Sequence, residues 1–344
     1  MAITIREADL ETDRDEIIRF LYENLTPQSN GSRFDWLYLG NPNGRARAWI
    51  AVDEGGRTIG AAAAFPRHFW IDGKSERAWV LGDFGIGREH RSLGPALQLQ
   101  RFVFASLASN DFAIAYDFPS ASMMGIYRRL GVPLLGRHVR HVKLIRADEK
   151  IDNWVRHEFF AQCLSYIGNW ALRFQQLPRF RNRDIEFSLH EGPFGKEFHT
   201  VNSGCALHPF QAVRSAEYLN WRYRKHPLKR YCVLAARRHS ELVGYGVVEI
   251  DDRHAMLAEL CANDMPKILP GMIAYIERIL REMKICSIGM PVLEHCHFVP
   301  HLRRAGFYPR ESVPVIACVT GGDKWLAGAR DPNNWLLLYG DRES

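Results

Sequence analysis

Short apolar runs broken by turn-forming residues predict two β-hairpins at corresponding places in the chain. The first joins residues 48–52 (Ala-Trp-Ile-Ala-Val) to residues 58–62 through a turn that contains two glycines. The second joins residues 231–235 (Tyr-Cys-Val-Leu-Ala) to residues 242–246 through a charged turn. Apolar segments bounded in this way are typical of paired strands. Each hairpin is therefore expected to belong to a β-sheet.

Three landmarks occur twice in the same order, which indicates an internal repeat. Residues 34–42 (FDWLYLGNP) correspond to residues 218–227 (YLNWRYRKHP), and in both a Trp precedes a Pro by six residues. The predicted hairpins follow these segments. Near the end of each half, YRRLG from Tyr127 corresponds to LRRAG from Leu302. We conclude that the chain consists of two related halves.

Each half is predicted to run strand, helix, several strands, helix, strand, helix, strand. This order is typical of an α/β fold in which helices flank a mixed, mostly antiparallel sheet. Apolar residues at three- and four-residue steps predict a further helix over residues 149–177, ended by Pro178. The expected organisation is an N-terminal domain at 1–147, a connecting helix and linker at 148–194, a C-terminal domain at 195–325 and a tail at 326–344.

Composition indicates a globular protein, with 47% hydrophobic and 24% charged residues among 344. Uncharged apolar runs of the length needed for a membrane span do not occur, and the first residues lack the pattern of a signal peptide. The seven cysteines are scattered and absent from the first 162 residues, which favours thiols in a reducing compartment over a disulfide framework. We expect a cytoplasmic protein.

The net charge of +6 is unevenly distributed. Eight Lys and Arg residues lie between Arg214 and Arg238 and are opposed only by Glu217. Two interpretations stay open for this segment. It can attract nucleic acid, acidic lipid or a phosphorylated ligand, or it can be a solvated face that keeps the protein soluble.

The segment from Trp79 to Gln100 carries the most specific chemistry. An apolar strand runs into a short polar turn, and a helix is predicted to begin at about Gly94, with Pro95 in its first turn. A helix N-terminus presents unpaired N–H groups and partial positive charge, which suit a pyrophosphate. Gly94 has no side chain to obstruct a ligand, and Arg91 adds a full charge. The turn therefore predicts a phosphate-binding site.

These residues resemble the GNAT acyltransferase superfamily. Arg91 to Ala96 (RSLGPA) satisfies its Arg/Gln-x-x-Gly-x-Gly/Ala signature. Tyr127 and Gly131 match a second family motif, in which Ser120 replaces an Asn. The resemblance covers residues 1–145 well and 195–320 loosely, because the second half lacks the signature and has Leu302 in place of the tyrosine. It implies a tandem form whose degenerate C-terminal half shapes the acceptor pocket or covers the active half.

The resemblance implies an acyl-CoA-dependent N-acyltransferase that uses acetyl-CoA and acts on a small amine or amino sugar by direct attack. Two strands would splay apart, and the pantetheine arm would lie between them against exposed backbone. The residues implied in donor binding are Phe84, Ile86, Arg91, Ser92, Leu93, Gly94, Ala96 and Ser120.

Two residues are candidates for proton transfer. Tyr127, by its family position, would protonate the departing thiolate; the alternative is a tyrosine that fills the core. Asp83 is the only carboxylate inside an otherwise apolar strand, where partial removal from water raises the pKa of a carboxyl group and suits a general base. The alternative for Asp83 is a structural partner for a nearby arginine. Asp117 and Glu89 are secondary candidates.

Other functions are less well supported by the residues. Glu294, His295, Cys296, His297 and His301 could supply metal ligands, but no paired cluster completes a site, so we expect no metal. A transferase that takes amino acids from charged tRNA would explain the basic segment but would not need the intact turn at Arg91–Ala96. The third alternative is a CoA-binding protein that has lost catalysis.

Overall fold

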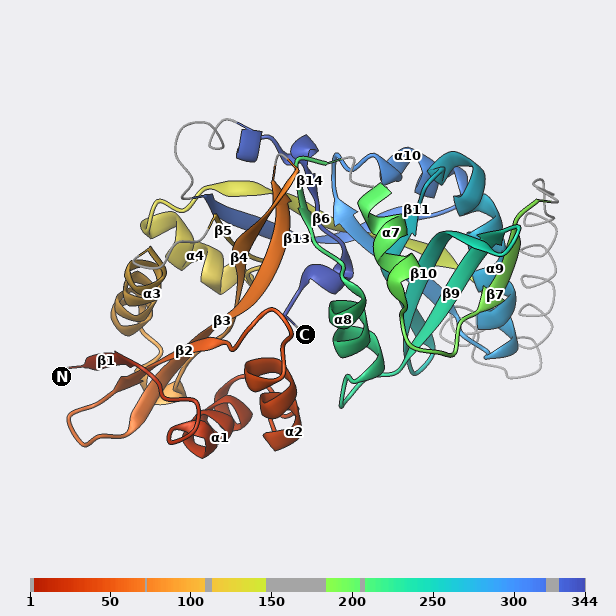
Figure 1. Ribbon diagram of the computed structural model, residues 1–344. Coiled ribbons are helices and arrows are strands. Elements are labelled where there is room, and N and C mark those ends of the chain that lie inside the picture. The colour runs from red at the N-terminus through yellow and green to blue at the C-terminus, as the bar shows by residue number, and fades with distance from the viewer. Residues whose placement is uncertain are drawn as a thin grey trace, which may run out of the picture.

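The computed structural model describes residues 3–71, 73–108, 113–146, 184–204, 208–319 and 328–343. Over these ranges helices flank one large, mostly antiparallel sheet (Figure 1), which confirms the predicted fold class. The helix predicted at 149–177 lies outside the described residues. None of the described helices is both long enough and apolar enough to cross a membrane.

The N-terminal half follows the predicted order of elements. In chain order these are β1 (Thr4–Glu7), α1 (Arg14–Asn24), α2 (Gly31–Phe34), a π-helix (Asp35–Leu39), β2 (Arg47–Val52), β3 (Thr58–Ile71), β4 (Lys74–Ile86), a 3-10 turn (Arg88–His90), α3 (Leu93–Ala108), β5 (Ile114–Asp117), α4 (Ala121–Arg129) and β6 (Leu134–Leu144). The predicted first hairpin is β2 and β3, which pair antiparallel. Helix α3 begins one residue from the predicted start.

The C-terminal half repeats this order. Its elements are β7 (Glu186–Leu189), α7 (Lys196–Gly204), β8 (Phe210–Ala212), α8 (Ala216–Leu219), a π-helix (Asn220–Arg224), β9 (Tyr231–Arg238), β10 (Glu241–Asp251), β11 (His254–Ala262), α9 (Met265–Glu282), β12 (Ser287–Leu293), α10 (Phe298–Arg304) and β13 (Tyr308–Val319), followed by β14 (Trp335–Leu336) between two 3-10 turns (Pro332–Asn334 and Tyr339–Asp341). The second predicted hairpin is β9 and β10. The repeat seen in the sequence is thus a repeat of structure.

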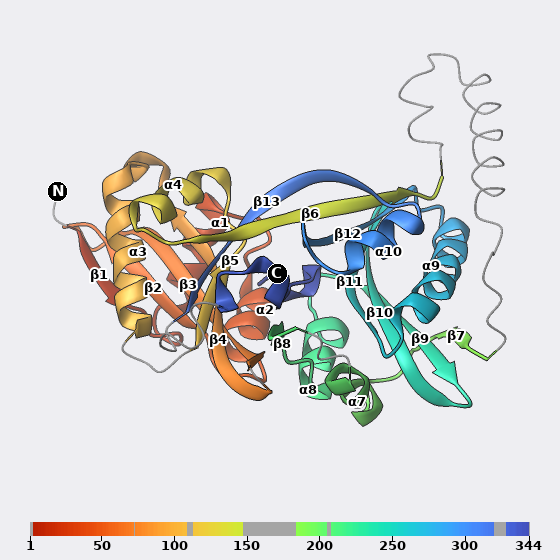
Figure 2. The same cartoon turned by 90° about the horizontal axis from the view of Figure 1, so that it is seen from above.

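The two halves exchange their last long strands. The main path of the sheet runs β1-β2-β3-β4-β5-β13-β6-β12-β11-β10-β9-β7. Strand β13 of the C-terminal half therefore pairs with β5 of the N-terminal half, and β6 of the N-terminal half pairs with β12. Figure 2 shows β6 and β13 crossing side by side from one half to the other. Separating the halves would break both strand pairings.

The tryptophans of the repeated motif meet at the junction between the halves. The rings of Trp36 and Trp221 stack with centroids 4.6 Å apart. Each Nε1–H donates to the backbone oxygen of the other tryptophan at 3.0 Å. Both side chains are buried, so they anchor the core and join the two copies of the repeated motif through reciprocal contacts.

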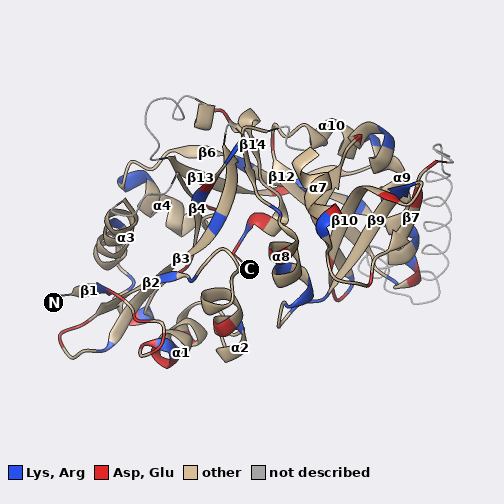
Figure 3. Ribbon diagram, viewed as in Figure 1, with Lys and Arg blue, Asp and Glu red and all other residues tan. Residues whose placement is uncertain are grey.

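The basic segment at 214–238 does not form the continuous surface that the sequence suggested. Arg214 and Arg222 are buried, with 5% and 2% of their surface exposed. Arg214 donates hydrogen bonds to Glu259 and Asp341, and Arg222 reaches backbone oxygens of the C-terminal tail. On the ribbon, the positions of Lys and Arg are interspersed with those of Asp and Glu (Figure 3). The expectation of a surface patch was wrong for these two arginines because their partners lie far away in the sequence.

Candidate active site

A bulge in β4 makes this strand diverge from its neighbour β5. The two strands pair in parallel only where Ala78–Val80 faces Ile114–Tyr116. Farther along, the register of β4 against β3 shifts, so that Asp83 and Phe84 together lie opposite a single residue of β3, Ala62. Asp83 has a φ of 45°, in the left-handed region. A bulge bends its strand and increases the local twist, and here it opens a gap between β4 and β5.

A cleft of about 780 Å³ occupies this gap. Its walls are the end of β4, the start of α3, the segment from β5 to α4, and the tail at Glu343. Seven of the eight residues implied in donor binding line it, namely Phe84, Ile86, Arg91, Ser92, Leu93, Ala96 and Ser120. Asp83 lines it as well, whereas Gly94 is not among the lining residues. Residues from two separate sequence motifs thus line one cavity.

The N-terminus of α3 opens onto this cleft. The helix begins at Leu93, so the amides of its first turn have no partner within the helix. Gly94 is exposed, and a Cβ built there would meet no atom within 4 Å. The Arg91 guanidinium donates to the backbone oxygens of Ile86 and Asn24, each at 3.3 Å, which holds it at the rim. Free amides, a cation and open space suit a diphosphate.

Ser120 has a structural role at the opposite wall. It is the N-cap of α4, and its hydroxyl accepts a hydrogen bond from the amide of Met123 at 3.3 Å. Serine is among the preferred residues at this position. The same hydroxyl lies 2.9 Å from that of Ser122, and both residues line the cleft. Ser120 therefore caps α4 and contributes to the wall of the cleft.

Asp83 is held by an ion pair. Its two carboxylate oxygens accept from the two terminal nitrogens of Arg33 at 2.8 Å each, and Tyr38 donates its hydroxyl at 2.7 Å. Both partners of the pair are buried, with side-chain exposures of 6% and 5%. Burial acts to lower the pKa of Arg33, but the charge of Asp83, its hydrogen bonds to Arg33 and further nearby groups together outweigh burial and raise this pKa. Of the two alternatives for Asp83, the geometry favours the partner of an arginine.

Tyr127 contacts the cleft through a carboxylate. The tyrosine is 1% exposed, and its hydroxyl donates to Oδ2 of Asp117 at 2.7 Å. Asp117 lines the cleft, whereas Tyr127 lies behind it. Burial, followed by the charge of Glu343, raises the pKa of Asp117 to about 7. Asp117 is therefore poised to exchange a proton near neutral pH. Glu89 is exposed beside Arg57 and lines a separate hollow.

Glu343 is a cleft residue that the sequence did not reveal. Arg222 donates to the backbone oxygens of Arg342 at 3.0 Å and Glu343 at 3.2 Å. Upstream in the tail, Asp341 pairs with Arg214 at 2.8 Å. These contacts bring the Glu343 side chain against Gly82, where a Cβ would lie 2.7 Å from its Cγ. Burial and the charge of Asp83 raise the pKa of Glu343.

The described residues hold no group of three or more His, Cys, Asp or Glu side chains arranged to bind a metal ion. In the His-rich segment, Nδ1 of His297 lies 2.6 Å from Nε2 of His208. This segment belongs to another cavity, which is described below.

The comparison with family models decides the identity of the N-terminal half. Residues 4–134 match the model described as "Acetyltransferase (GNAT) domain". This half is a GNAT domain. The bulged β4, the turn after it and helix α3 all lie within the matched residues. No curated protein matches the chain.

Solved structures extend the likeness beyond the GNAT domain. A GCN5-related N-acetyltransferase from Anabaena variabilis has a TM-score of 0.65 at 12% identity, over 92% of this chain and 73% of that one. A probable N-acyltransferase from Enterococcus faecalis has a TM-score of 0.64 at 12% identity, over 93% and 72%. Eis1 from Mycobacterium abscessus has a TM-score of 0.59 at 15% identity, over 95% and 76%. At these identities the likeness shows the fold, and it covers both halves.

Proposed function

We propose that the chain is an acyl-CoA-dependent N-acyltransferase that uses acetyl-CoA and acts on a small-molecule amine. One observation carries the proposal. The gap between β4 and β5 opens directly onto the start of α3, where Gly94 leaves space beside the first-turn amides. An elongated gap that ends at an anion-binding helix terminus suits a donor with an arm and a diphosphate.

In this proposal, the diphosphate lies on the α3 amides beside Arg91, and the pantetheine arm lies between the diverging strands. The backbone of β4 from Phe84 to Ile86 faces this gap without a pairing partner in β5, so it can hydrogen-bond to the amides of the arm. Backbone N–H groups of the same segment would polarise the thioester carbonyl.

Acyl transfer requires two proton movements. A neutral amine attacks the thioester carbonyl, the C–N bond forms, and the C–S bond breaks to release a thiolate that takes up a proton. We assign acceptance of the amine proton to Glu343, whose carboxylate lines the cleft. Asp117, with Tyr127 bonded to its Oδ2, supplies the proton to the thiolate. Asp83, paired with Arg33, holds the bulge in place.

The experiment compares thermal stabilisation of the full chain by acetyl-CoA, longer acyl-CoAs and tRNA. A ligand at 100 times its dissociation constant stabilises by about 2.7 kcal/mol. Gly94→Glu, which places a carboxylate at the start of α3, is expected to remove stabilisation by acetyl-CoA. Gln98→Glu is the control, because Gln98 lies on the exposed face of the same helix and the substitution adds the same charge beyond the first turn. This variant is expected to retain most of the stabilisation by acetyl-CoA.

The outcomes separate the alternatives. Equal stabilisation of the parent and Gly94→Glu by acetyl-CoA would place the donor elsewhere. Stabilisation by charged tRNA without any response to acyl-CoA would favour the tRNA-dependent transferase. Binding of acetyl-CoA without turnover on a panel of amines and amino sugars would favour a CoA-binding protein without catalysis.

A further inference from the structure

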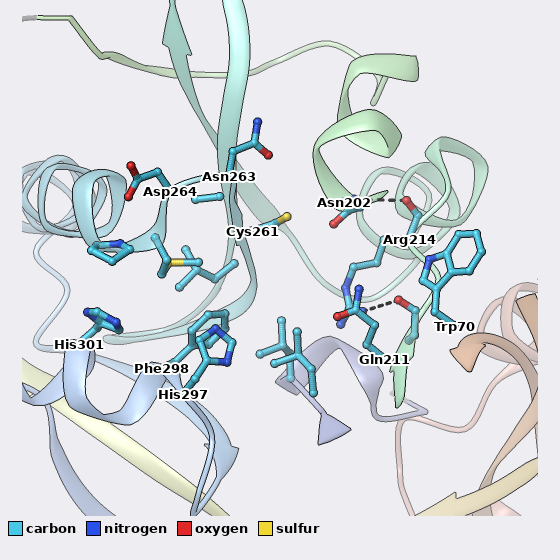
Figure 4. A pocket seen from close by; sticks show the side chains of 17 residues that line it. Trp70, Asn202, Gln211, Arg214, Cys261, Asn263, Asp264, His297, Phe298 and His301 are labelled. Atoms are coloured by element: carbon cyan, nitrogen blue, oxygen red, sulfur yellow. Dashed lines mark hydrogen bonds between the residues drawn. The ribbon is translucent and has the colours of Figure 1, made fainter. Parts of the chain in front are cut away.

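The C-terminal half contains a second cavity at the position that corresponds to the donor cleft. Strand β11 pairs with β12 in parallel only where His254–Met256 faces Ser287–Gly289, and the two strands then diverge. A cavity of about 310 Å³ lies beyond this point. It is enclosed by the end of β11, the starts of α9 and α10, and the strands β8 and β14 (Figure 4).

The start of α9 does not suit a phosphate. Its N-cap is Asp264, whose carboxylate accepts from the amide of Lys267 at 3.3 Å and pairs with the Lys267 ammonium at 2.6 Å. A negative charge therefore already occupies the position that a diphosphate would take. The cavity is also smaller than the donor cleft. A ligand here would be chemically different from an acyl-CoA.

His297, one of the residues that line the cavity, has an unpartnered imidazole nitrogen. Nδ1 of His208 lies 3.2 Å from the backbone oxygen of Asn333, so this nitrogen carries the proton and Nε2 accepts. His297 must then donate from Nδ1 to that Nε2, which leaves Nε2 of His297 as an acceptor. This atom is buried and has no partner among the described residues. Burial, followed by the charges of neighbouring histidines, lowers the pKa of His297 to about 4, so the ring stays neutral at pH 7.

A second unpartnered acceptor comes from β8. The side chain of Gln211 is drawn among those that surround the cavity in Figure 4, and the residue is 5% exposed. Its Oε1 is buried and has no partner in the described part of the chain. Leaving such an acceptor unpaired destabilises the folded state. Two such acceptors on residues that line one cavity favour a ligand that brings hydrogen-bond donors.

The remaining walls set the polarity of that ligand. Trp70, Phe298, Leu336 and Leu338 supply apolar surface. The charged groups at the cavity are compensated, since Asp264 is paired with Lys267 and Arg214 is bonded to Glu259 and Asp341. Neither a cation nor an anion would find a free counter-charge among these described side chains.

We propose that this cavity is a second small-molecule site, for a neutral ligand that carries two O–H or N–H donors on an apolar body. The donors pair with Nε2 of His297 and Oε1 of Gln211, and the body packs between the apolar walls.

Resorcinol and hydroquinone are suitable probes, because each is neutral at pH 7 and carries two hydroxyl donors on an apolar ring at different spacings. 1,3-Dimethoxybenzene has a similar shape without donors and is the matched control. Binding to the full chain is measured by saturation-transfer NMR, and the location by hydrogen exchange of the amides at residues 335–338, which include two wall residues. At least one diphenol is expected to bind and protect these amides. The ether is expected to bind at least about tenfold more weakly, since it offers no donor to either acceptor.

Two variants make the test specific. Gln211→Leu removes one acceptor at similar size and is expected to weaken diphenol binding about tenfold. Gln98→Leu, at an exposed position of α3, is the control and is expected to leave binding unchanged. His297→Phe removes the other acceptor but keeps a ring. This variant replaces Gln211→Leu in the binding test if Gln211→Leu does not fold.

Three results would overturn the proposal: no binding of either diphenol, equal binding of the ether, or unchanged affinity in the variants. Tighter binding of m-xylylenediamine than of either diphenol would overturn the assignment of a neutral ligand. No acyl-CoA is present in these measurements, so their outcome is independent of the function proposed for the N-terminal cleft.

Discussion

The buried ion pair between Arg33 and Asp83 gives a sharp test of what Asp83 does. Arg33→Met removes the cation and leaves a carboxylate that is 5% exposed. Of its three hydrogen bonds only the one from Tyr38 would remain. Breaking a buried pair in this way costs about 3–5 kcal/mol, because it leaves a charge out of water without a partner. We expect Arg33→Met to lower the free energy of unfolding by that amount.

The double variant Arg33→Met/Asp83→Leu removes both charges and is expected to be more stable than Arg33→Met alone. Replacing both partners by apolar groups is often neutral or stabilising. Arg14→Met is the matched control, because Arg14 pairs with Asp35 at the surface, where side-chain exposures are 31% and 56%. An exposed pair of this kind contributes about 0–1 kcal/mol.

The assay is urea unfolding of the full chain, followed by tryptophan fluorescence, together with turnover of each variant. Two results would refute the structural role of the pair. One is an Arg33→Met variant no less stable than Arg14→Met. The other is an Asp83→Asn variant that keeps its stability but loses turnover by 100-fold or more, which is the behaviour of a general base.

The remaining predictions concern the proton-transfer groups of the cleft. Tyr127→Phe is expected to lower kcat about 100-fold with little change in the affinity for acetyl-CoA; unchanged kcat in steady-state assays would assign Tyr127 to the core alone. Asp117 has a pKa of about 7, above its usual value of 3.8, so its contribution to stability is present below about pH 4 and is lost as the pH rises through 7. We therefore compare the free energy of unfolding of Asp117→Asn with that of the parent, by urea unfolding at pH 4 and at pH 8. The difference should favour the variant more at pH 8 than at pH 4. An equal difference at both pH values would contradict this. Gly82→Ala places a methyl group within 2.7 Å of Glu343, and both it and Glu343→Gln are expected to lower kcat with acetyl-CoA affinity retained. Full turnover of Glu343→Gln would remove Glu343 from the mechanism.

Local pattern was enough to predict the elements and to single out residues that line one side of the cleft. The apolar runs of the hairpins, the strand before Gly87 and the helix after Leu93 are set by nearby residues, so the sequence shows them directly. The repeat also predicted that the halves would be alike. The repeat could not show that the two halves exchange β6 and β13, because the residue pattern of a strand does not identify a pairing partner that is distant in the chain.

The same limit explains what was missed in the cleft. Asp83 lines the cleft, but its partner Arg33 lies on α2, 50 residues earlier in the chain. Glu343 is brought in by contacts of the tail with Arg222 and Arg214, which in the sequence resemble surface charges. In both cases the deciding contacts join an arginine to residues that are remote in sequence.

The most direct test of the proposed donor site is a crystal structure of the full chain grown with excess coenzyme A. The predicted result is a diphosphate within hydrogen-bond distance of the amides at Leu93 and Gly94, with the pantetheine arm between β4 and β5. A structure in which coenzyme A binds elsewhere, or in which side chains fill that corner and the ligand is absent, would contradict it.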